Sequence, residues 1–550
     1  MIRRGLGVFS ASMVLTATIT FLAAGAAGAQ SATATPPAPA AAPTRAAALD
    51  AMKRATAFMI EKVAHKGGFV WTYLPDLSRR WGEIEARETM IWIQPPGTPT
   101  MGHIFLDAYH GTGDEFYYRA AEQVTAALIY AQRPAGGWNY VADWAGDQSL
   151  REWYDTVGRN AWRLEEFQHL WGNATFDDGG TAQSATLLLR MYLEKRDPGI
   201  KAALDKAIRF VLDSQYPIGA WPQRFPLQYE FTHHGRPDYT SYLTFNDDVT
   251  AGNIEFLILC YQALGEERFL DPIRRGMVSF IVTQMGPPQA GWALQYTPDL
   301  QPAGARTYEP RALATHTTAA CVEQLLKFYR LTGDTRFLAR IPEALDWLDA
   351  VRLPADVAAI AGRSHPTFIE PGTNRPLYVH RRGSNVVNGE YYVDGDPRNT
   401  IGHYNSFRQV DVARMRADLA DAKALAPSEL AKQSPLAPGI PPSPLARYFE
   451  VLAPRAFGPP GAAAPAPADR AARVMAALDA QGRWLTDLGS TSHPYRGDGS
   501  PTVAPGNFAN TNVGDDSDTS PYRAGALIGI STQAYVRNMA DLIRFVSPMR

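Results

Sequence analysis

The sequence has few cysteines and almost no net charge. Only Cys260 and Cys321 occur in the 550 residues, both inside apolar helical patterns. One disulfide could join them, but two buried thiols are the expected state. The formal net charge of −2 offers no basic field, which excludes nucleic acid as a partner. A polyanionic ligand would therefore need a local basic patch or a metal ion.

Long apolar runs are also scarce. The clearest one, residues 8–26, follows Arg3 and Arg4 and ends in Ala-Gly-Ala at residues 27–29, the form that a signal peptidase cuts. An uncleaved membrane anchor is the alternative, but the Gly and Ala content and the small-residue ending favour cleavage. No later segment is apolar enough to span a bilayer. We expect an exported protein, periplasmic or extracellular, with no membrane contact after cleavage.

The remaining composition predicts four segments. Residues 1–29 read as a signal peptide, and residues 30–45, almost only Ala, Pro, Ser and Thr, as a tether that cannot bury a core. With 45% hydrophobic and 11% aromatic residues, the mature chain can form one large toroidal or barrel domain, or two to three ordinary ones. We assign residues 46–383 to a toroidal domain and residues 384–550 to a C-terminal extension packed on it.

A repeat governs the middle of the chain. Each copy is a helix with apolar residues at helical spacing, then Gln, then a Gly-containing turn, then Trp. The three clear copies end at Trp138, Trp221 and Trp292, at intervals of 83 and 71 residues, and residues 67–71 form a degenerate first copy. Each interval has room for two helices and one long loop.

Partner helices lie between these turns. Apolar stripes predict helices at residues 178–196, 253–264 and 318–331, and each ends at a Gly or Pro breaker. Strand signals are few. The expected fold is all-α: an incomplete α/α toroid, a ring of helical hairpins with long loops at one end. An α-solenoid scaffold without an active site is the alternative, but the long loops, rich in Trp, Tyr, Asn, Asp and Arg, favour a binding function.

The pattern weakens after residue 384. Residues 424–468 are rich in Pro and Ala, with one helical stretch expected around residues 445–452. Residues 489–518 are polar and Gly-rich, and a last amphipathic helix is expected at about 531–546.

Three loop segments carry candidate chemistry. Residues 175–181 (Thr-Phe-Asp-Asp-Gly-Gly-Thr) and 242–250 (Tyr-Leu-Thr-Phe-Asn-Asp-Asp-Val-Thr) each precede a helix. Helix capping explains one Asp in each, whereas several adjacent oxygen ligands also suit a hard cation. The third, residues 304–309 (Gly-Ala-Arg-Thr-Tyr-Glu), is either a surface Arg–Glu pair or part of a site.

Together these segments resemble family 10 of the polysaccharide lyases, the pectate lyases with an incomplete α/α toroid. That family carries Thr-Ile-Asp-Asn-Gly-Ala-Thr, Gly-Gly-Trp-Pro-Gln, Thr-Phe-Asn-Asp, Ala-Arg-Ala-Tyr-Glu and Thr-Asn-Arg-Pro-Ile-Phe-Ser-Gly-Arg-Asp-Gly. The counterparts here occur in the same order, at residues 175–181, 219–223, 244–247, 305–309 and 373–383. The common order is far more specific than any one segment and indicates a divergent member.

The resemblance implies roles for the polar loop residues. Asp247 would be a ligand of Ca²⁺, with Asn246 beside it at the metal. Asp177 would lie close to metal and substrate, and Asp178 falls on the family's Asn position. Arg306 would be the arginine that takes the proton. Its replacement by alanine is expected to remove turnover with little loss of folding, and Asp247→Ala to lower calcium affinity.

Further residues are implied in substrate binding. Arg375 and Arg381 fall on arginines of the last motif and would bind substrate carboxylates, since a guanidinium matches a carboxylate bidentately. Trp221 could stack on a sugar face, although a Trp in a repeated turn is at least as often packing. The implied partner is an acidic polysaccharide, and a monomer is expected.

The implied reaction is calcium-assisted β-elimination on a pectate-like polyuronate. A base removes the proton at C5 beside the uronate carboxylate, and a cation with one or two arginines neutralises that carboxylate. An arginine is ordinarily never deprotonated, so a base role needs a desolvated site beside other cations.

The chain departs from the family around this site. Asn139 and Tyr140 follow Trp138 where the family has Pro-Lys, Gln295 leads into Tyr-Thr instead of His-Asp, and Arg382 replaces an Asp. Residues 310–316 replace a Ser-Gly-rich stretch. The polymer therefore stays open. A glycoside hydrolase on the same toroid, using two facing carboxylates, and a non-catalytic carbohydrate-binding protein remain the alternatives.

Overall fold

The computed structural model describes most of the chain after residue 42. The described residues are 43–158, 165–228, 238–382, 390–398, 400, 406–451, 468–489, 491–492, 521–522 and 527–547. All of them belong to one compact unit, Pro43–Arg550. The predicted signal peptide and nearly all of the tether lie outside the described residues. No helix in the described part of the chain has the length and apolar character needed to cross a membrane.

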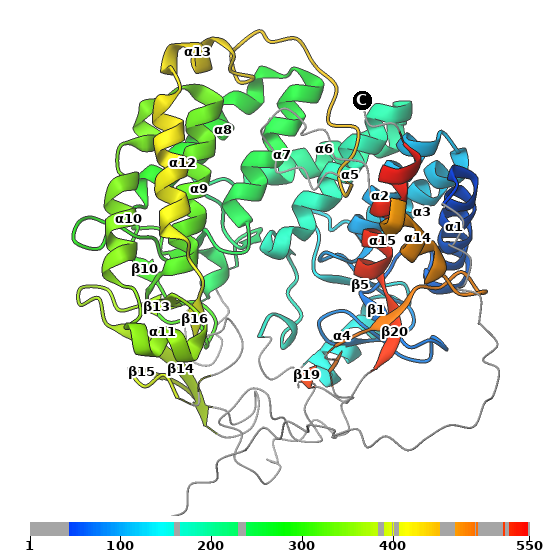
Figure 1. Ribbon diagram of the computed structural model, residues 1–550, viewed down its shortest axis with the longest axis horizontal. Helices are drawn as coiled ribbons and strands as arrows, with labels where there is room; N and C mark the ends of the chain where they lie inside the picture. Colours follow the sequence, from blue (N-terminus) through cyan, green and yellow to red (C-terminus); the bar gives the residue numbers. More distant parts are fainter. Residues whose placement is uncertain are drawn as a thin grey trace, which may run out of the picture. The chain divides into compact units, whose positions relative to one another are not determined.

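Helices dominate the described residues (Figure 1). They are α1 (Arg45–Phe58), α2 (Thr98–Thr112), α3 (Glu115–Ala131), α4 (Asp147–Thr156), α5 (Gly180–Lys195), α6 (Pro198–Asp213), α7 (Val249–Leu264), α8 (Leu270–Val282), α9 (Thr315–Thr332), α10 (Ile341–Ala350), α11 (Ala355–Ala361), α12 (Val412–Ala424), α13 (Pro427–Lys432), α14 (Ala468–Ala476) and α15 (Thr532–Val546).

The strands are short and join loops to one another. They are β1 (Thr72–Tyr73), β2 (Arg80–Trp81), β3 (Glu85–Ala86), β4 (Met90–Trp92), β5 (Val141–Asp143), β6 (Ala174–Thr175), β7 (Arg224–Phe225), β8 (Leu243–Thr244), β9 (Gln295–Tyr296), β10 (Pro302–Ala303), β11 (Leu313–Ala314), β12 (His365–Pro366), β13 (Phe368–Ile369), β14 (Pro376–Arg382), β15 (Glu390–Asp394), β16 (Phe407–Arg408), β17 (Leu485–Asp487), β18 (Thr491–Ser492), β19 (Pro521–Tyr522) and β20 (Ile528–Ser531). Their pairings are antiparallel. The largest sheet, in the order β17-β20-β1-β2-β3, ties the C-terminal region to the first loop.

The helices pack as successive hairpins. Helix α2 packs on α3, α5 on α6, α7 on α8 and α9 on α10, and the first members of neighbouring hairpins also meet, α2 with α5 and α5 with α7. Helix α12 lies against α9 and α10. The fold is the predicted all-α incomplete α/α toroid. Cys260 and Cys321 are buried free thiols, as expected.

Hydrogen bonds explain the repeated Gln, Gly and Trp. The Gln132 amide donates to Gly136 O in its own turn and to Ala203 O in the next outer helix, α6. Gln215 and Gln284 make the same pair of bonds one and two hairpins further on. Each repeat therefore ties its own turn to the following hairpin, which fixes the angular step of the ring.

The turn glycines are required by their conformation and by space. Gly136 and Gly219 have φ of 112° and 107°, where a side chain is strained. A Cβ at Gly219 would lie 2.0 Å from the carbonyl oxygen of Arg275 in α8. The turn can approach the next helix this closely only without a side chain.

A further copy of the repeat lies near the C-terminus and is not recognised from the sequence. The Trp484 indole donates to Val474 O in α14, ten residues upstream, as Trp138 donates to Leu128 O. Gly482 approaches the carbonyl of Arg54 in α1. Helix α15 then packs on α1, α2 and α14 (Figure 1). The C-terminal region thus contributes a hairpin next to the first one.

The expected helix around residues 445–452 is wrong for the described residues 445–451, which form no helix. A buried carboxylate explains the difference. Asp107, fully buried in α2, accepts hydrogen bonds from the backbone N–H groups of Phe449, Glu450 and Val451. Its charge is balanced by Arg190 of α5 at 2.7 Å. Three amides held by one carboxylate fix an irregular segment against α2 and α5.

Candidate active site

Two equivalent loops precede the neighbouring inner helices α5 and α7. Thr-Phe-Asp-Asp at residues 175–178 corresponds to Thr-Phe-Asn-Asp at 244–247. In both loops a Thr further on, Thr181 or Thr250, binds the backbone N–H of the preceding repeat Trp. Because α5 and α7 are in contact, the repeat brings the two acidic loops together.

Three carboxylates from these loops form one cluster. Single oxygens of Asp177, Asp178 and Asp247 all lie within 4.8 Å of one another. Asp178 and Asp247 have φ of 52° and 51°, a left-handed conformation that is uncommon for non-glycine residues. Strained backbone of this kind is retained where the surroundings impose it, as at binding sites.

Desolvation and mutual repulsion act on the cluster. Burial and the charges of Asp177 and Asp178 raise the pKa of the Asp247 carboxyl well above its usual range. Desolvation, then the charges of Asp177 and Glu83, raise the pKa of Asp178, although its side chain stays open to water. Gln94 donates to the Asp178 carboxylate at 2.5 Å.

The residues present fit a hard divalent cation. Asp177 is buried, and its Oδ2 accepts a hydrogen bond of 2.5 Å from the Tyr140 hydroxyl. Its other oxygen, Oδ1, is buried with no hydrogen-bond partner among the described residues. A buried carboxylate oxygen without a donor is costly unless a cation contacts it. Asn246 donates from Nδ2 to Asp247 at 2.6 Å and so lies beside this cluster.

Arg306 is buried in the middle of four carboxylates. Its Nη2 lies 3.0 Å from both Asp247 and Glu309, and its Nη1 lies 3.5 Å from Asp177 and 3.7 Å from Glu166. Nε adds a second bond to Glu309 at 3.0 Å. Arg306 is therefore no surface partner of Glu309. It is the central cation of an otherwise acidic site.

Two buried acids, Glu165 and Glu166, were missed from the sequence. Glu165 accepts hydrogen bonds from the backbone and side chain of Thr307, and Glu166 accepts one from Tyr308 at 3.1 Å. Desolvation raises the pKa of Glu165 to about 8, against the lowering effects of the Thr307 hydrogen bond and Arg306. Desolvation also raises the pKa of Glu166. The structure thus packs a second acidic layer behind the Arg306 loop.

The structure contradicts the proposed sugar stacking of Trp221. Its side chain is fully buried, and the indole N–H donates to Val211 O in α6 at 2.8 Å. The ring fills the core between hairpins, as Trp138 and Trp292 do. Packing in the repeated turn accounts for this tryptophan.

The two outlying arginines lie in the β13–β14 region. Arg375 is exposed in the turn between these strands and pairs with Glu370 at 2.7 Å. The backbone of Arg381 lies in β14 opposite Tyr391 of β15, but its side chain lies outside what the structure describes. Their role in substrate binding stays a prediction.

Comparison with known proteins identifies the class. The family model described as pectic acid lyase matches residues 142–396, which include the acidic cluster and Arg306. The protein is a polysaccharide lyase. More narrowly, residues 142–396 match the pectic acid lyase family, as a divergent form of it. None of the curated proteins matches the sequence significantly.

Solved structures that resemble the chain are distant. A family 10 polysaccharide lyase from Cellvibrio cellulosa is 16% identical, with a TM-score of 0.32, covering 61% of this chain and 98% of its own. A cellobiose 2-epimerase from Spirochaeta thermophila is 13% identical, with a TM-score of 0.38, covering 60% and 76%. An unsaturated glucuronyl hydrolase specific for heparin is 12% identical, with a TM-score of 0.36, covering 91% and 97%.

Proposed function

We propose that the protein is exported and cleaves a polyuronate chain by calcium-assisted β-elimination, acting as a monomer. The observation that supports this most directly is the pairing of a three-carboxylate cluster with a buried guanidinium at the ends of two neighbouring inner helices. Carboxylate oxygens are the ligands that Ca²⁺ prefers. An acidic polymer can approach so acidic a site only if its charge is compensated by cations.

Asp177, Asp178 and Asp247 are the proposed calcium ligands, with Asn246 adjacent. When bound, Ca²⁺ would neutralise the uronate carboxylate and add positive charge beside Arg306. Arg306 is the proposed acceptor of the C5 proton. The electron pair of the C5–H bond then forms the C4–C5 double bond, and the C4–O4 bond breaks with its electrons on O4, which leaves as a hydroxyl after gaining a proton.

Glu309 orients the Arg306 guanidinium for this role. Its two oxygens accept from Nε and Nη2, both at 3.0 Å, and Oε2 also accepts from the Arg306 backbone N–H. Because four carboxylates surround the Arg306 guanidinium, a base function depends on additional positive charge next to it. Catalysis is therefore expected to require the cation and not merely to be stimulated by it.

The reaction class is tested by its product. We expect cleavage of at least one uronate polymer in a panel, with ultraviolet absorbance rising from the new double bond and lost on addition of a chelator. Reducing ends that appear without absorbance would show a hydrolase. Binding without cleavage at every calcium concentration would show a carbohydrate-binding protein. Cleavage that continues in a chelator would contradict the calcium assignment.

The cation site is tested by calorimetry in the absence of substrate. Asp247→Asn is expected to weaken calcium binding by roughly tenfold or more, because one of three charged ligands is lost. Asp248→Asn is the matched control, since Asp248 is the next residue but lies outside the cluster. Equal losses in both variants, or no calcium binding by the parent protein, would contradict the ligand assignment.

A further inference from the structure

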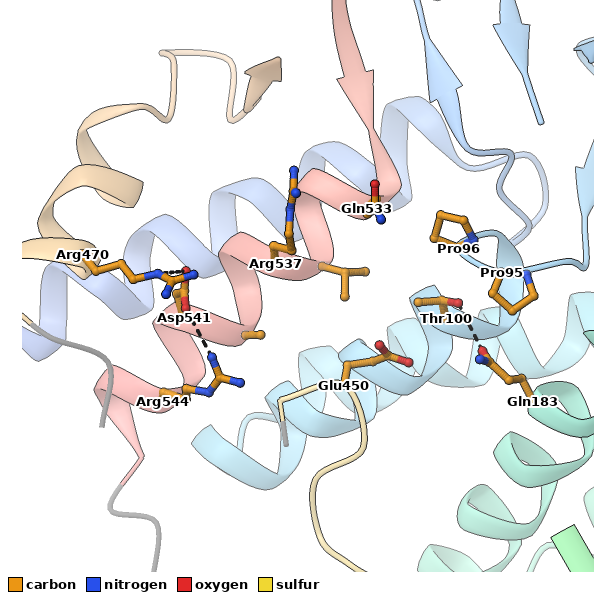
Figure 2. A pocket seen from close by; sticks show the side chains of 12 residues that line it. Pro95, Pro96, Thr100, Gln183, Glu450, Arg470, Gln533, Arg537, Asp541 and Arg544 are labelled. Carbon is orange, nitrogen blue, oxygen red and sulfur yellow. Dashed lines mark hydrogen bonds and ion pairs between the residues drawn. The ribbon is translucent and has the colours of Figure 1, made fainter. Parts of the chain in front are cut away.

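A polar pocket of about 430 Å³, apart from the acidic cluster, lies between the C-terminal hairpin and the first inner helices. Its residues come from α14 and α15, from the segment fixed by Asp107, and from the starts of α2 and α5 (Figure 2). The volume is that of a site for a small molecule or one or two sugar units. Most of the wall is built by residues outside the matched family segment.

Helix α15 supplies one wall because of its spacing. Gln533, Arg537 and Asp541 recur every four residues and therefore share one face of the helix. Residues on the opposite face, such as Tyr535, Met539 and Leu542, are buried in the core. The polar face of α15 therefore lines the pocket.

The pocket has an excess of positive charge. Arg470 and Arg544 both pair with the Asp541 carboxylate, at 2.7 and 3.4 Å. Arg537 has no hydrogen bond or ion pair among the residues that the structure describes and is exposed. One guanidinium is thus available for a carboxylate, the group that it binds bidentately.

The pocket also contains a largely buried acid, Glu450. The Glu450 side chain lines the pocket, and in the described part of the chain its carboxyl group has no hydrogen bond. Only its backbone N–H is used, in the bond to Asp107. Desolvation, with the charge of Asp107, raises the pKa of Glu450 to about 7. A carboxyl group here can exchange hydrogen bonds with sugar hydroxyls.

The opposite wall adjoins the acidic cluster. Gln183 lies in the first turn of α5, five positions after Asp178, and hydrogen-bonds Thr100 of α2. Pro95 and Pro96, which also line the pocket, follow Gln94, the hydrogen-bond donor to Asp178. The wall of the pocket and the acidic cluster are thus built from neighbouring residues at the start of α5 and in the loop before α2.

We propose that this pocket binds a uronate unit of the same polymer chain that is cleaved at the acidic cluster. The sugar carboxylate binds Arg537, and its hydroxyls bind Glu450 and Gln183, while Pro95 and Val536 supply apolar contact. The choice of a uronate as the ligand rests on the proposed function, whereas the pocket itself does not. It gives the C-terminal hairpin a role in holding long substrates.

The test measures binding and turnover against substrate length. Some uronate oligomers are too short to extend from the acidic cluster into the pocket. For these, the Kd and KM of Arg537→Gln are expected to equal those of the parent protein. For longer oligomers the variant's Kd and KM are expected to rise about tenfold or more, as for a lost charged hydrogen bond, with kcat within twofold. Glu450→Gln is expected to give a smaller, equally length-dependent loss. Arg473→Gln, an exposed arginine of the same hairpin that does not line the pocket, is the control.

The outcomes separate this inference from the proposed function. Kd is measured calorimetrically on the complete chain with uronate oligomers and with neutral oligomers of equal length. If no uronate polymer is cleaved but the Arg537-dependent, length-dependent binding is found, the pocket assignment stands and the catalytic one fails. If cleavage occurs and Arg537→Gln leaves the length profile unchanged, the pocket assignment fails alone. The pocket assignment is also overturned if Arg537→Gln raises Kd equally for oligomers of every length. It is likewise overturned if Arg473→Gln gives the same rise in Kd, or if Arg537→Gln gives the same rise with neutral oligomers.

Discussion

Arg306→Lys is expected to lower kcat by about 10³-fold, the range for loss of a group that transfers a proton and stabilises charge in the transition state. Lysine keeps the positive charge among the four carboxylates. It cannot reproduce the fork in which Nε and Nη2 both bind Glu309 while Nη2 also reaches Asp247. The loss is measured as kcat on the cleaved polymer at saturating calcium.

The control is Arg311→Lys, an exposed arginine of the same loop that donates from Nε to the carbonyl of Pro302. It is expected to retain the parent kcat within twofold. If Arg306→Lys kept kcat within tenfold of the parent value, charge alone would explain the residue and another group would have to accept the proton.

Alanine at this position is a poorer test than the sequence suggests. From the sequence, Arg306→Ala is expected to spare folding. The structure buries Arg306 together with Glu309, Asp177 and Glu166. Removing one partner of buried charges costs about 3–5 kcal/mol, because the others lose their counter-ion. We therefore expect Arg306→Ala to lose stability as well as turnover, which is why lysine is preferred.

The toroid could be predicted because its repeat is local. Gln132, Gly136 and Trp138 lie within seven residues, and the hydrogen bonds that define the turn use these residues. The copy at Trp484 has the same indole bond but no Gln at the corresponding position, and the segment before it, rich in Pro and Ala, interrupts the periodicity. The hairpin of α14 and α15 is therefore recognised only in space.

The site could be predicted in part. Asp177, Asp178 and Asp247 are predictable because each lies among adjacent oxygen ligands before a helix and within a motif that resembles the lyase family. Arg306 was found through the order of motifs. The repeat also explains why the predicted sugar stacking of Trp221 is wrong. A tryptophan that recurs in every turn packs in the core beneath that turn.

Glu165 and Glu166 could not be predicted. A Glu-Glu pair in a polar stretch is typical of a solvated surface, and their hydrogen-bond partners Thr307 and Tyr308 lie 142 residues further along the chain. No local pattern carries that information. The two acids are buried where residues 165–167 pack against the Arg306 loop.

Glu165→Gln is expected to stabilise the protein at alkaline pH. In the folded protein desolvation raises the pKa of Glu165 to about 8, from 4.5. Folding therefore binds a proton at this site, and its contribution to stability is complete below about pH 4.5 and is lost as pH rises through 8. A shift of this size corresponds to roughly 5 kcal/mol at the alkaline limit.

The amide of glutamine resembles the protonated acid. Its oxygen can accept both hydrogen bonds from Thr307, as the Glu165 Oε1 does, and it never ionises. The variant is therefore expected to match the parent near pH 5 and to exceed its free energy of unfolding by several kcal/mol above pH 8. Denaturant unfolding at a series of pH values gives the difference between the two curves, in which all other ionisable groups cancel to first order.

Glu429→Gln provides the matched control, because Glu429 is exposed and its pair with Lys432 lies at the surface. Its curve is expected to remain parallel to that of the parent from pH 5 to 9. Parallel curves for Glu165→Gln as well would mean that Glu165 ionises normally and that the second acidic layer is open to water. If instead the Glu165→Gln curve diverges from that of the parent, Glu165 is an uncharged acid behind Arg306 at neutral pH. Arg306 and the bound cation then have one negative charge fewer to neutralise.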